Sequence, residues 1–206
     1  MDWATGRIER KYTDLIMNVW DFDDTIYDGE SGMHMLRFFL RRKPSLARHL
    51  PRAAVGIFKY KTGRLQAEQV AEQAGDLLAL FLDKAGSGDI ATDMREFWDA
   101  HEQNIRPLYR ELQQPDDVIV SAGPEQSLRE ICGRLGVQHY IGSVVNEQTK
   151  HLDFVCYRDN KVKAFRERFP DAVIENFYSD SMDDKPMMDL AQRAFMVDGN
   201  KMTQIK

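Results

Sequence analysis

The chain has 206 residues, of which 43% are hydrophobic and 30% are charged, and it has a formal net charge of −5 at pH 7. This composition is typical of a folded domain with a sizeable core and argues against a disordered chain. No apolar run approaches the roughly 20 residues that a membrane-spanning helix needs, and residues 1–14 lack the apolar core of a signal peptide. Cys132 and Cys156 have neither metal-site nor redox spacing, so we expect reduced thiols and a cytoplasmic protein.

Short apolar runs ended by polar groups recur along the chain and indicate buried parallel strands. Their ranges are 15–20, 118–120, 173–178 and 194–197. Helical patterns lie between them at 124–135, 160–169 and 184–193, and Asn160 is the expected N-cap of the second. The alternation predicts an α/β fold with a Rossmann-like parallel sheet, in which ligands bind outside the carboxyl ends of the strands.

The stretch between the first two strands has a different pattern. Residues 31–112 show apolar residues at helical spacing, for example Met35 and Phe39, and no convincing strand alternation. About 80 residues is too long for a loop in a compact domain. We therefore predict an inserted α-helical cap subdomain. The boundaries are 31–112 for the cap, 17–30 and 113–206 for the catalytic core, and 1–16 for an N-terminal extension of unassigned role.

A basic block lies within the predicted cap. Between Ser31 and Ala67 the chain has nine Lys or Arg and no Asp or Glu. These basic residues are Arg37, Arg41, Arg42, Lys43, Arg48, Arg52, Lys59, Lys61 and Arg64. Apolar residues interleave with them, which suits either a solvated face over the cap's own core or contact of segment 37–64 with an anionic membrane. Nucleic acid is not expected as a partner, because the rest of the chain is strongly acidic.

The sharpest chemical signal follows the first predicted strand, where Asp21 and Asp23 are spaced i, i+2. Two carboxylates at a strand end can hold a hard cation through oxygen, while one attacks and the other moves protons. An EF-hand calcium loop begins similarly. It is excluded here because Ile26 stands where that loop needs Gly, and Gly32 where it needs Glu.

Further candidate site residues follow the later strands. Ser121 ends the second apolar run and precedes Ala122, Gly123 and a helix start, where free N–H groups favour an anion. Lys161 opens a later helix, and Asp180 follows the third apolar run. Strand ends of one parallel sheet meet at one edge, so we expect these residues close to the aspartate pair.

Four segments occur in order: Asp21-Phe22-Asp23-Asp24-Thr25, Ser121, Lys161 and Asp180-Ser181-x-x-Asp184. With them the chain resembles the haloacid dehalogenase superfamily of phosphohydrolases, over roughly residues 17–200. The helical insertion after the first segment is similar to the cap of its phosphoserine-phosphatase-like branch. The resemblance implies that Asp21 is a nucleophile that becomes an aspartyl phosphate, and that Asp23 is the acid and base. It also implies Mg²⁺ on Asp21, the Asp23 carbonyl and Asp180.

The same resemblance implies supporting roles for other residues. Ser121, with Ala122 and Gly123, would bind the phosphoryl oxygens. Lys161 would neutralise the phosphoryl charge, and Asp184 would hold Lys161 or a water on the metal.

Several of these assignments have rivals in the sequence. Lys163 competes with Lys161, Lys150 is a weaker candidate, and Asp183 competes with Asp184. Asp24 stands where the family often has Gly, and we interpret it as a turn residue. Glu30 lies nine positions after Asp21, where phosphoserine phosphatases have a substrate-binding glutamate, but an exposed loop acid or helix-start residue explains it equally well.

The expected activity is Mg²⁺-dependent hydrolysis of a small phosphorylated metabolite. Phosphoserine is an alternative, although Ala74 falls where that branch has an arginine for the substrate carboxylate. A lipid phosphate such as phosphatidylglycerophosphate is a second alternative, suggested by the basic block. A haloacid dehalogenase needs no leaving-group acid, so Asp23 argues against that activity.

Overall fold

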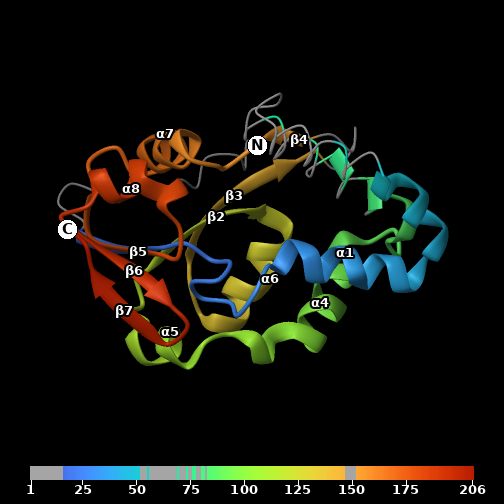
Figure 1. The fold of residues 1–206 in the computed structure, drawn as a ribbon, viewed down its shortest axis with the longest axis horizontal. Helices are drawn as coiled ribbons and strands as arrows, with labels where there is room; N and C mark the ends of the chain where they lie inside the picture. The colour runs from blue at the N-terminus through green and yellow to red at the C-terminus, as the bar shows by residue number, and fades with distance from the viewer. Residues whose placement is uncertain are drawn as a thin grey trace, which may run out of the picture.

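The computed structural model describes residues 16–51, 55, 69, 73, 76, 77, 80, 81, 83–146 and 152–206. Its described part contains a seven-stranded sheet in the order β4-β3-β2-β1-β5-β6-β7 (Figure 1). The strands are β1 Ile16–Trp20, β2 Val118–Pro124, β3 His139–Val145, β4 Leu152–Phe154, β5 Val173–Ser179, β6 Arg193–Asp198 and β7 Lys201–Gln204. β1 lies at the centre and is parallel to β2 and β5, whereas β4 and β7 are antiparallel edge strands.

Helices cover both faces of the sheet (Figure 1). The α-helices are α1 Ser31–Arg42, α4 Ile90–His101, α5 Pro107–Leu112, α6 Glu125–Leu135, α7 Asp159–Arg168 and α8 Lys185–Leu190. Short 3₁₀ helices are η1 Pro44–His49, η2 Glu102–Asn104 and η3 Met182–Asp184. Among the residues that the structure describes, no helix is long and apolar enough to cross a membrane.

The alternation of side chains along β1 places its apolar residues on two separate cores. Met17 and Val19 join the cluster that α7 and α8 cover, whereas Trp20 joins the cluster beneath α5 and α6. The second cluster continues without a break into α1 and α4. There the Trp98 indole N–H donates to the Ser127 carbonyl at 3.0 Å and so fixes α4 on α6. The sheet is therefore buried on both faces, as parallel sheets are.

The predicted α/β fold is confirmed. Three strands, β3, β4 and β7, were not predicted, and the other differences lie at element ends. The second strand continues to Pro124, so Ser121 lies within β2 rather than after it, and Pro124 is the N-cap of α6. Asn160 was wrongly predicted as a cap. The α7 helix begins at Asp159, and the Asn160 side chain donates instead to the Val155 carbonyl. The helix predicted at 184–193 is divided into η3 and the shorter α8.

The described residues of segment 31–112 are helical or irregular and include no named strand, in line with their predicted pattern. The two ends of this segment lie side by side. Tyr27 forms an antiparallel bridge with Ile105, and the Asp28 N–H donates to the Asn104 carbonyl at 2.8 Å. The division into a core at 17–30 and 113–206 and a cap at 31–112 stays a prediction, and nearly all of 1–16 lies outside the described residues.

Gly142 on β3 is required by a close approach of two strands. A Cβ atom at this position would lie 2.7 Å from the Gly123 carbonyl oxygen and 2.8 Å from Leu128 Cδ1. The next residue, Ser143, donates its hydroxyl to the Ala122 carbonyl at 2.7 Å and accepts the Cys156 N–H at 3.0 Å. β3 therefore fixes the end of β2 and the loop that leads into α7.

We expect the substitution Gly142→Ala to lower the free energy of unfolding by about 1–3 kcal/mol, because the added methyl group overpacks a rigid contact. Equilibrium urea denaturation measures this change. Gly133→Ala is the matched control. It lies within α6, and a methyl group added there would have no neighbouring atom within 4 Å, so it should raise stability by about 0.5–1 kcal/mol. Equal or greater stability of the Gly142→Ala protein would contradict the packing argument.

Candidate active site

Asp21 and Asp23 leave the carboxyl end of β1 with separate partners. Asp21 is buried, and its main-chain N–H still donates to the Tyr178 carbonyl of β5 at 2.9 Å. The Asp23 carboxylate accepts the Ser31 N–H at 2.7 Å, at the first residue of α1. The pair therefore spans the junction between the sheet and the inserted helices.

Lys161 is the lysine that reaches this pair. Its ammonium group lies 2.7 Å from Asp21 Oδ1 and 2.7 Å from Asp184 Oδ1, and its side chain is only 4% exposed. Lys163 is exposed and donates to Asn160 at 3.3 Å instead. Lys150 lies outside the described residues. Of the two rivals that the structure describes, Lys161 alone contacts the predicted nucleophile.

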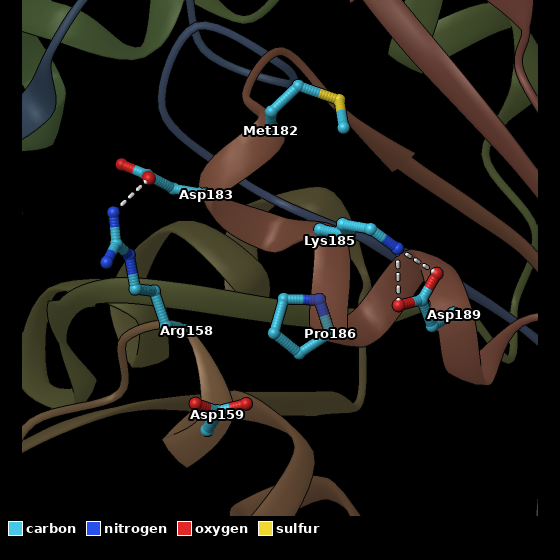
Figure 2. Close-up of a pocket in the computed structure, with 7 residues that line it drawn as sticks. All are labelled: Arg158, Asp159, Met182, Asp183, Lys185, Pro186 and Asp189. Carbon is cyan, nitrogen blue, oxygen red and sulfur yellow. Dashed lines mark hydrogen bonds and ion pairs between the residues drawn. The ribbon is translucent and has the colours of Figure 1, made fainter.

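Asp184 and Asp183 face different neighbours. Asp184 is buried against Lys161 and also accepts the Ser179 hydroxyl at 2.8 Å. Asp183 points toward Arg158, which is 2.6 Å away (Figure 2), and accepts the Tyr157 hydroxyl at 2.5 Å. Asp183 thus joins the loop before α7 to the loop after β5, and the open surface pocket beside it is lined by neither Asp21 nor Lys161.

Asp180 and Asp21 meet across Thr25, which the sequence pattern did not single out. The buried Thr25 hydroxyl lies 3.4 Å from Asp21 Oδ2 and 3.4 Å from Asp180 Oδ1. It also accepts the Asp180 N–H at 2.9 Å. The only signal in the sequence was its place at the end of the Asp21–Thr25 segment, where a hydroxyl can bond to a neighbouring carboxylate.

Ser121 lies on the strand next to β1 but makes only local contacts. Its buried hydroxyl oxygen accepts the Gly123 N–H at 2.9 Å. Within the described residues, no hydrogen bond or ion pair joins Ser121 to Asp21 or Lys161. Ala122 is exposed and Gly123 is half-buried.

Glu30 precedes α1 at the N-cap position, but its side chain makes no capping hydrogen bond. Burial raises its pKa, and the charges of Asp23, Asp24 and Asp180 raise it further. Glu30 itself is exposed, so a part in substrate binding stays a prediction.

The site has an excess of negative charge. Burial raises the pKa of Asp21 to about 8, against the opposing effect of Lys161 and with the help of Asp184. Burial also raises the pKa values of Asp23 and Asp180. For Lys161, burial alone would lower the pKa, but Asp21 and Asp184 outweigh it and keep the ammonium group charged. One ammonium group among four carboxylates leaves the site short of positive charge.

The residues present fit a hard divalent cation. Asp21 and Asp180 supply two carboxylates on either side of Thr25, and oxygen donors of this kind suit Mg²⁺. No group of three His, Cys, Asp or Glu side chains forms a metal site in the described part of the chain. A cation here would therefore rely on these two carboxylates, main-chain oxygen such as the Asp23 carbonyl, and water.

The predicted membrane contact of segment 37–64 stays a prediction. In its described part, Arg42 forms ion pairs with Asp93 and Glu96, and Lys43 donates to the Lys84 carbonyl. Arg52, Lys59, Lys61 and Arg64 lie outside the described residues, as does Ala74.

Comparisons with known proteins give one family and one fold. A sequence model of the haloacid dehalogenase-like hydrolase family matches residues 19–189. No curated protein matches the chain in sequence. Among solved structures, a protein of unknown function from Bordetella pertussis Tohama I is similar with a TM-score of 0.71 and 21% identity, over 88% of this chain and 89% of that chain.

Two further solved structures are more distant. A phosphoserine phosphohydrolase-like protein from Francisella tularensis subsp. tularensis SCHU S4 has a TM-score of 0.57 at 17% identity, over 87% of this chain and 86% of that one. A probable phosphoserine phosphatase from Vibrio cholerae also has a TM-score of 0.57, at 14% identity, over 89% of this chain and 55% of that one. At these identities the likeness establishes the fold alone.

Lys161→Met should lower the free energy of unfolding by about 3 kcal/mol, because it leaves Asp21 and Asp184 buried without their cation. Lys163→Met is the matched control and should change it by less than about 0.5 kcal/mol, because Lys163 is exposed. Urea denaturation of both proteins at pH 7 distinguishes the two lysines. Equal effects would contradict the assignment of Lys161 as the buried partner.

Proposed function

Because the chain belongs to the haloacid dehalogenase-like hydrolase family, we propose that it is a phosphatase that hydrolyses a small phosphate monoester with Mg²⁺, through an aspartyl phosphate on Asp21. The observation that supports this most directly is the Lys161 ammonium group, buried between Asp21 and Asp184. A carboxylate cannot readily approach a phosphate dianion unless positive charge offsets their repulsion. Lys161 supplies such charge at the nucleophile itself.

The first half of the reaction uses both aspartates of the pair. An Asp21 carboxylate oxygen attacks phosphorus as the bond from phosphorus to the leaving oxygen breaks. Asp23 donates a proton to that oxygen, which leaves as an alcohol. Burial raises the pKa of Asp23, and this favours the protonated form that a leaving-group acid needs.

The second half reverses the role of Asp23. Its carboxylate removes a proton from water, whose oxygen attacks phosphorus, and the bond from phosphorus to Asp21 breaks. Inorganic phosphate is released and both aspartates return to their starting state. Ser121 and the main chain of Ala122 and Gly123 would hold phosphoryl oxygens during both steps.

The proposed metal would be held by Asp21, Asp180 and the Asp23 carbonyl. It would supply positive charge that offsets the phosphoryl charge and favours ionised Asp21. The carboxylates of Asp21 and Asp180, which meet across Thr25, support this part of the proposal.

We expect Asp21→Asn to lower kcat for p-nitrophenyl phosphate at least about 10³-fold, because the amide is a poor nucleophile. The measurement is release of p-nitrophenol with Mg²⁺ present. Asp189→Asn is the control, since the Asp189 side chain is exposed and pairs with Lys185 on the surface.

Full activity of the Asp21→Asn protein would overturn the nucleophile assignment. In the same assay, EDTA should abolish activity and added Mg²⁺ should restore it. Unchanged turnover in EDTA would overturn the metal requirement. The assignment of Asp21 as the nucleophile would then still depend on the Asp21→Asn measurement.

The substrate is proposed to be a small phosphometabolite other than L-phosphoserine. Support comes from Ala74 in the cap sequence, which offers no guanidinium for a substrate carboxylate. A panel of phosphorylated sugars, polyols, amino acids and lipid headgroups, compared by kcat/KM, is the measurement. A dominant kcat/KM for L-phosphoserine would contradict this prediction.

The variant Glu30→Gln, measured with the same panel, distinguishes the two interpretations of Glu30, as a substrate-binding residue or as an exposed acid without a role in binding. If Glu30 binds the leaving group, the variant should raise KM for the preferred substrate more than for p-nitrophenyl phosphate. Equal KM values in wild type and variant for both substrates would assign Glu30 no part in binding.

A further inference from the structure

The residue after the second aspartate of the pair has an unusual backbone. Asp24 has a φ of 52°, in the left-handed region that residues other than Gly seldom adopt. Its carboxylate accepts the Gly29 N–H at 3.0 Å, and its main-chain N–H donates to the Gly29 carbonyl at 3.2 Å. The chain thus turns sharply just after Asp23, and the Asp23 carboxylate accepts the Ser31 N–H where the loop ends at α1.

Arg106 reaches this turn from the far end of the inserted segment. Its guanidinium group lies 2.9 Å from Asp28 Oδ1 and 3.6 Å from Asp24 Oδ1. Its main-chain N–H donates to the Ile26 carbonyl at 2.8 Å. One residue therefore holds the loop between Asp23 and α1 through both its side chain and its main chain.

The Arg106 side chain is more buried than that of an arginine in an ordinary surface ion pair. Its side chain is only 11% exposed, and its buried Nε has no hydrogen-bond partner in the described structure. The guanidinium also packs beside the turn between β6 and β7, since a methyl group added at Gly199 would lie 3.7 Å from it. Burying a cation this far is unfavourable unless carboxylates face it, and here the facing carboxylates belong to the loop that follows Asp23.

The charge of Arg106 also acts where the site has too little positive charge. Asp24 directly follows Asp23, so Asp21, Asp23 and Asp24 place three carboxylates on one short stretch of chain. A cation 3.6 Å from the Asp24 carboxylate offsets part of this negative charge. Asp24 can therefore occupy a position beside two other acids.

We propose that Arg106 is a positioning residue for catalysis, which fixes the left-handed turn at Asp24 and so holds Asp23 in place for proton transfer. This inference rests on the proposed function for the role of Asp23. Arg106 itself contacts neither Asp21 nor Lys161 through any ion pair of the described residues. It acts through the loop.

The main test compares Arg106→Gln, Arg106→Lys and the control Arg110→Gln in steady-state hydrolysis of p-nitrophenyl phosphate. Arg110 lies one turn further along α5, is half exposed and pairs with Glu102 at 3.5 Å. Arg106→Gln should lower kcat about tenfold or more and change KM less than about threefold, because misplaced catalytic groups slow the chemical step. Arg106→Lys should retain part of the wild-type kcat. Lysine keeps the positive charge but lacks the planar guanidinium group, which can form two parallel hydrogen bonds.

A second readout does not need activity. Amide hydrogen exchange in a peptide spanning residues 22–30 should be faster in Arg106→Gln than in wild type and unchanged in Arg110→Gln. If Arg106→Gln folds poorly, Asp28→Asn removes the 2.9 Å pair from an exposed residue, and it should show the same effects at smaller size.

The outcomes are separable. Lower thermal stability with unchanged kcat, or faster exchange with unchanged kcat, would overturn the positioning role. Unchanged exchange in both Arg106→Gln and Asp28→Asn would overturn the anchoring on which it depends. A wild-type protein without phosphatase activity would refute the proposed function, and the exchange experiment would still decide whether Arg106 holds the loop.

Discussion

A buried ammonium group shared by two carboxylates is the interaction on which the site depends. Lys161, Asp21 and Asp184 come from α7, the end of β1 and the loop after β5. Each would be costly to bury alone, since an isolated buried ion loses several kcal/mol of hydration. Together they join three segments that are far apart in sequence. The parallel order of β2, β1 and β5 is what allows this, because it directs the carboxyl ends of neighbouring strands to one edge.

The sequence predicted the parallel strands β1, β2, β5 and β6 but missed the parallel strand β3, although four of its seven residues are buried, because Gly142 and Ser143 interrupt its apolar run. The central strands β1, β2 and β5 are apolar because helices cover both of their faces, and the polar residues that end them mark the site. The edge strand β7 was missed because all four of its residues are exposed, so main-chain hydrogen bonds to β6 define it without any apolar pattern. β4 was missed for a similar reason, since it is three residues long and has no fully buried side chain. Such strands leave little trace in sequence periodicity.

The site was predictable where chemistry limits the residue type and unpredictable where it depends on packing. Asp21, Asp23 and Asp180 were singled out because they follow apolar runs and belong to an ordered set of motifs that resembles a known family, and their catalytic roles stay a prediction. The choice of Lys161 over Lys163, and of Asp184 over Asp183, needed the direction of each side chain. Arg106 gave no signal, and Thr25 gave none beyond its place in the Asp21–Thr25 segment, because the role of a guanidinium or a hydroxyl depends on a partner that only the structure shows. Arg158, with a φ of 49° before α7, is a second left-handed residue whose strain sequence alone does not show.

The bridge between Tyr27 and Ile105 has a consequence for how this fold can vary. The segment between these two residues leaves the sheet and returns to it at neighbouring points. A few main-chain hydrogen bonds at its base hold its two ends together. Loop-closure entropy grows only with the logarithm of length, about 0.6 kcal/mol for each doubling. A change of length between α1 and α4 therefore costs little closure entropy, whereas α1 and α4 themselves share a core with Trp20 and Leu128 and are constrained by it. Such a change would leave the contacts among Asp21, Lys161 and Asp184 in place.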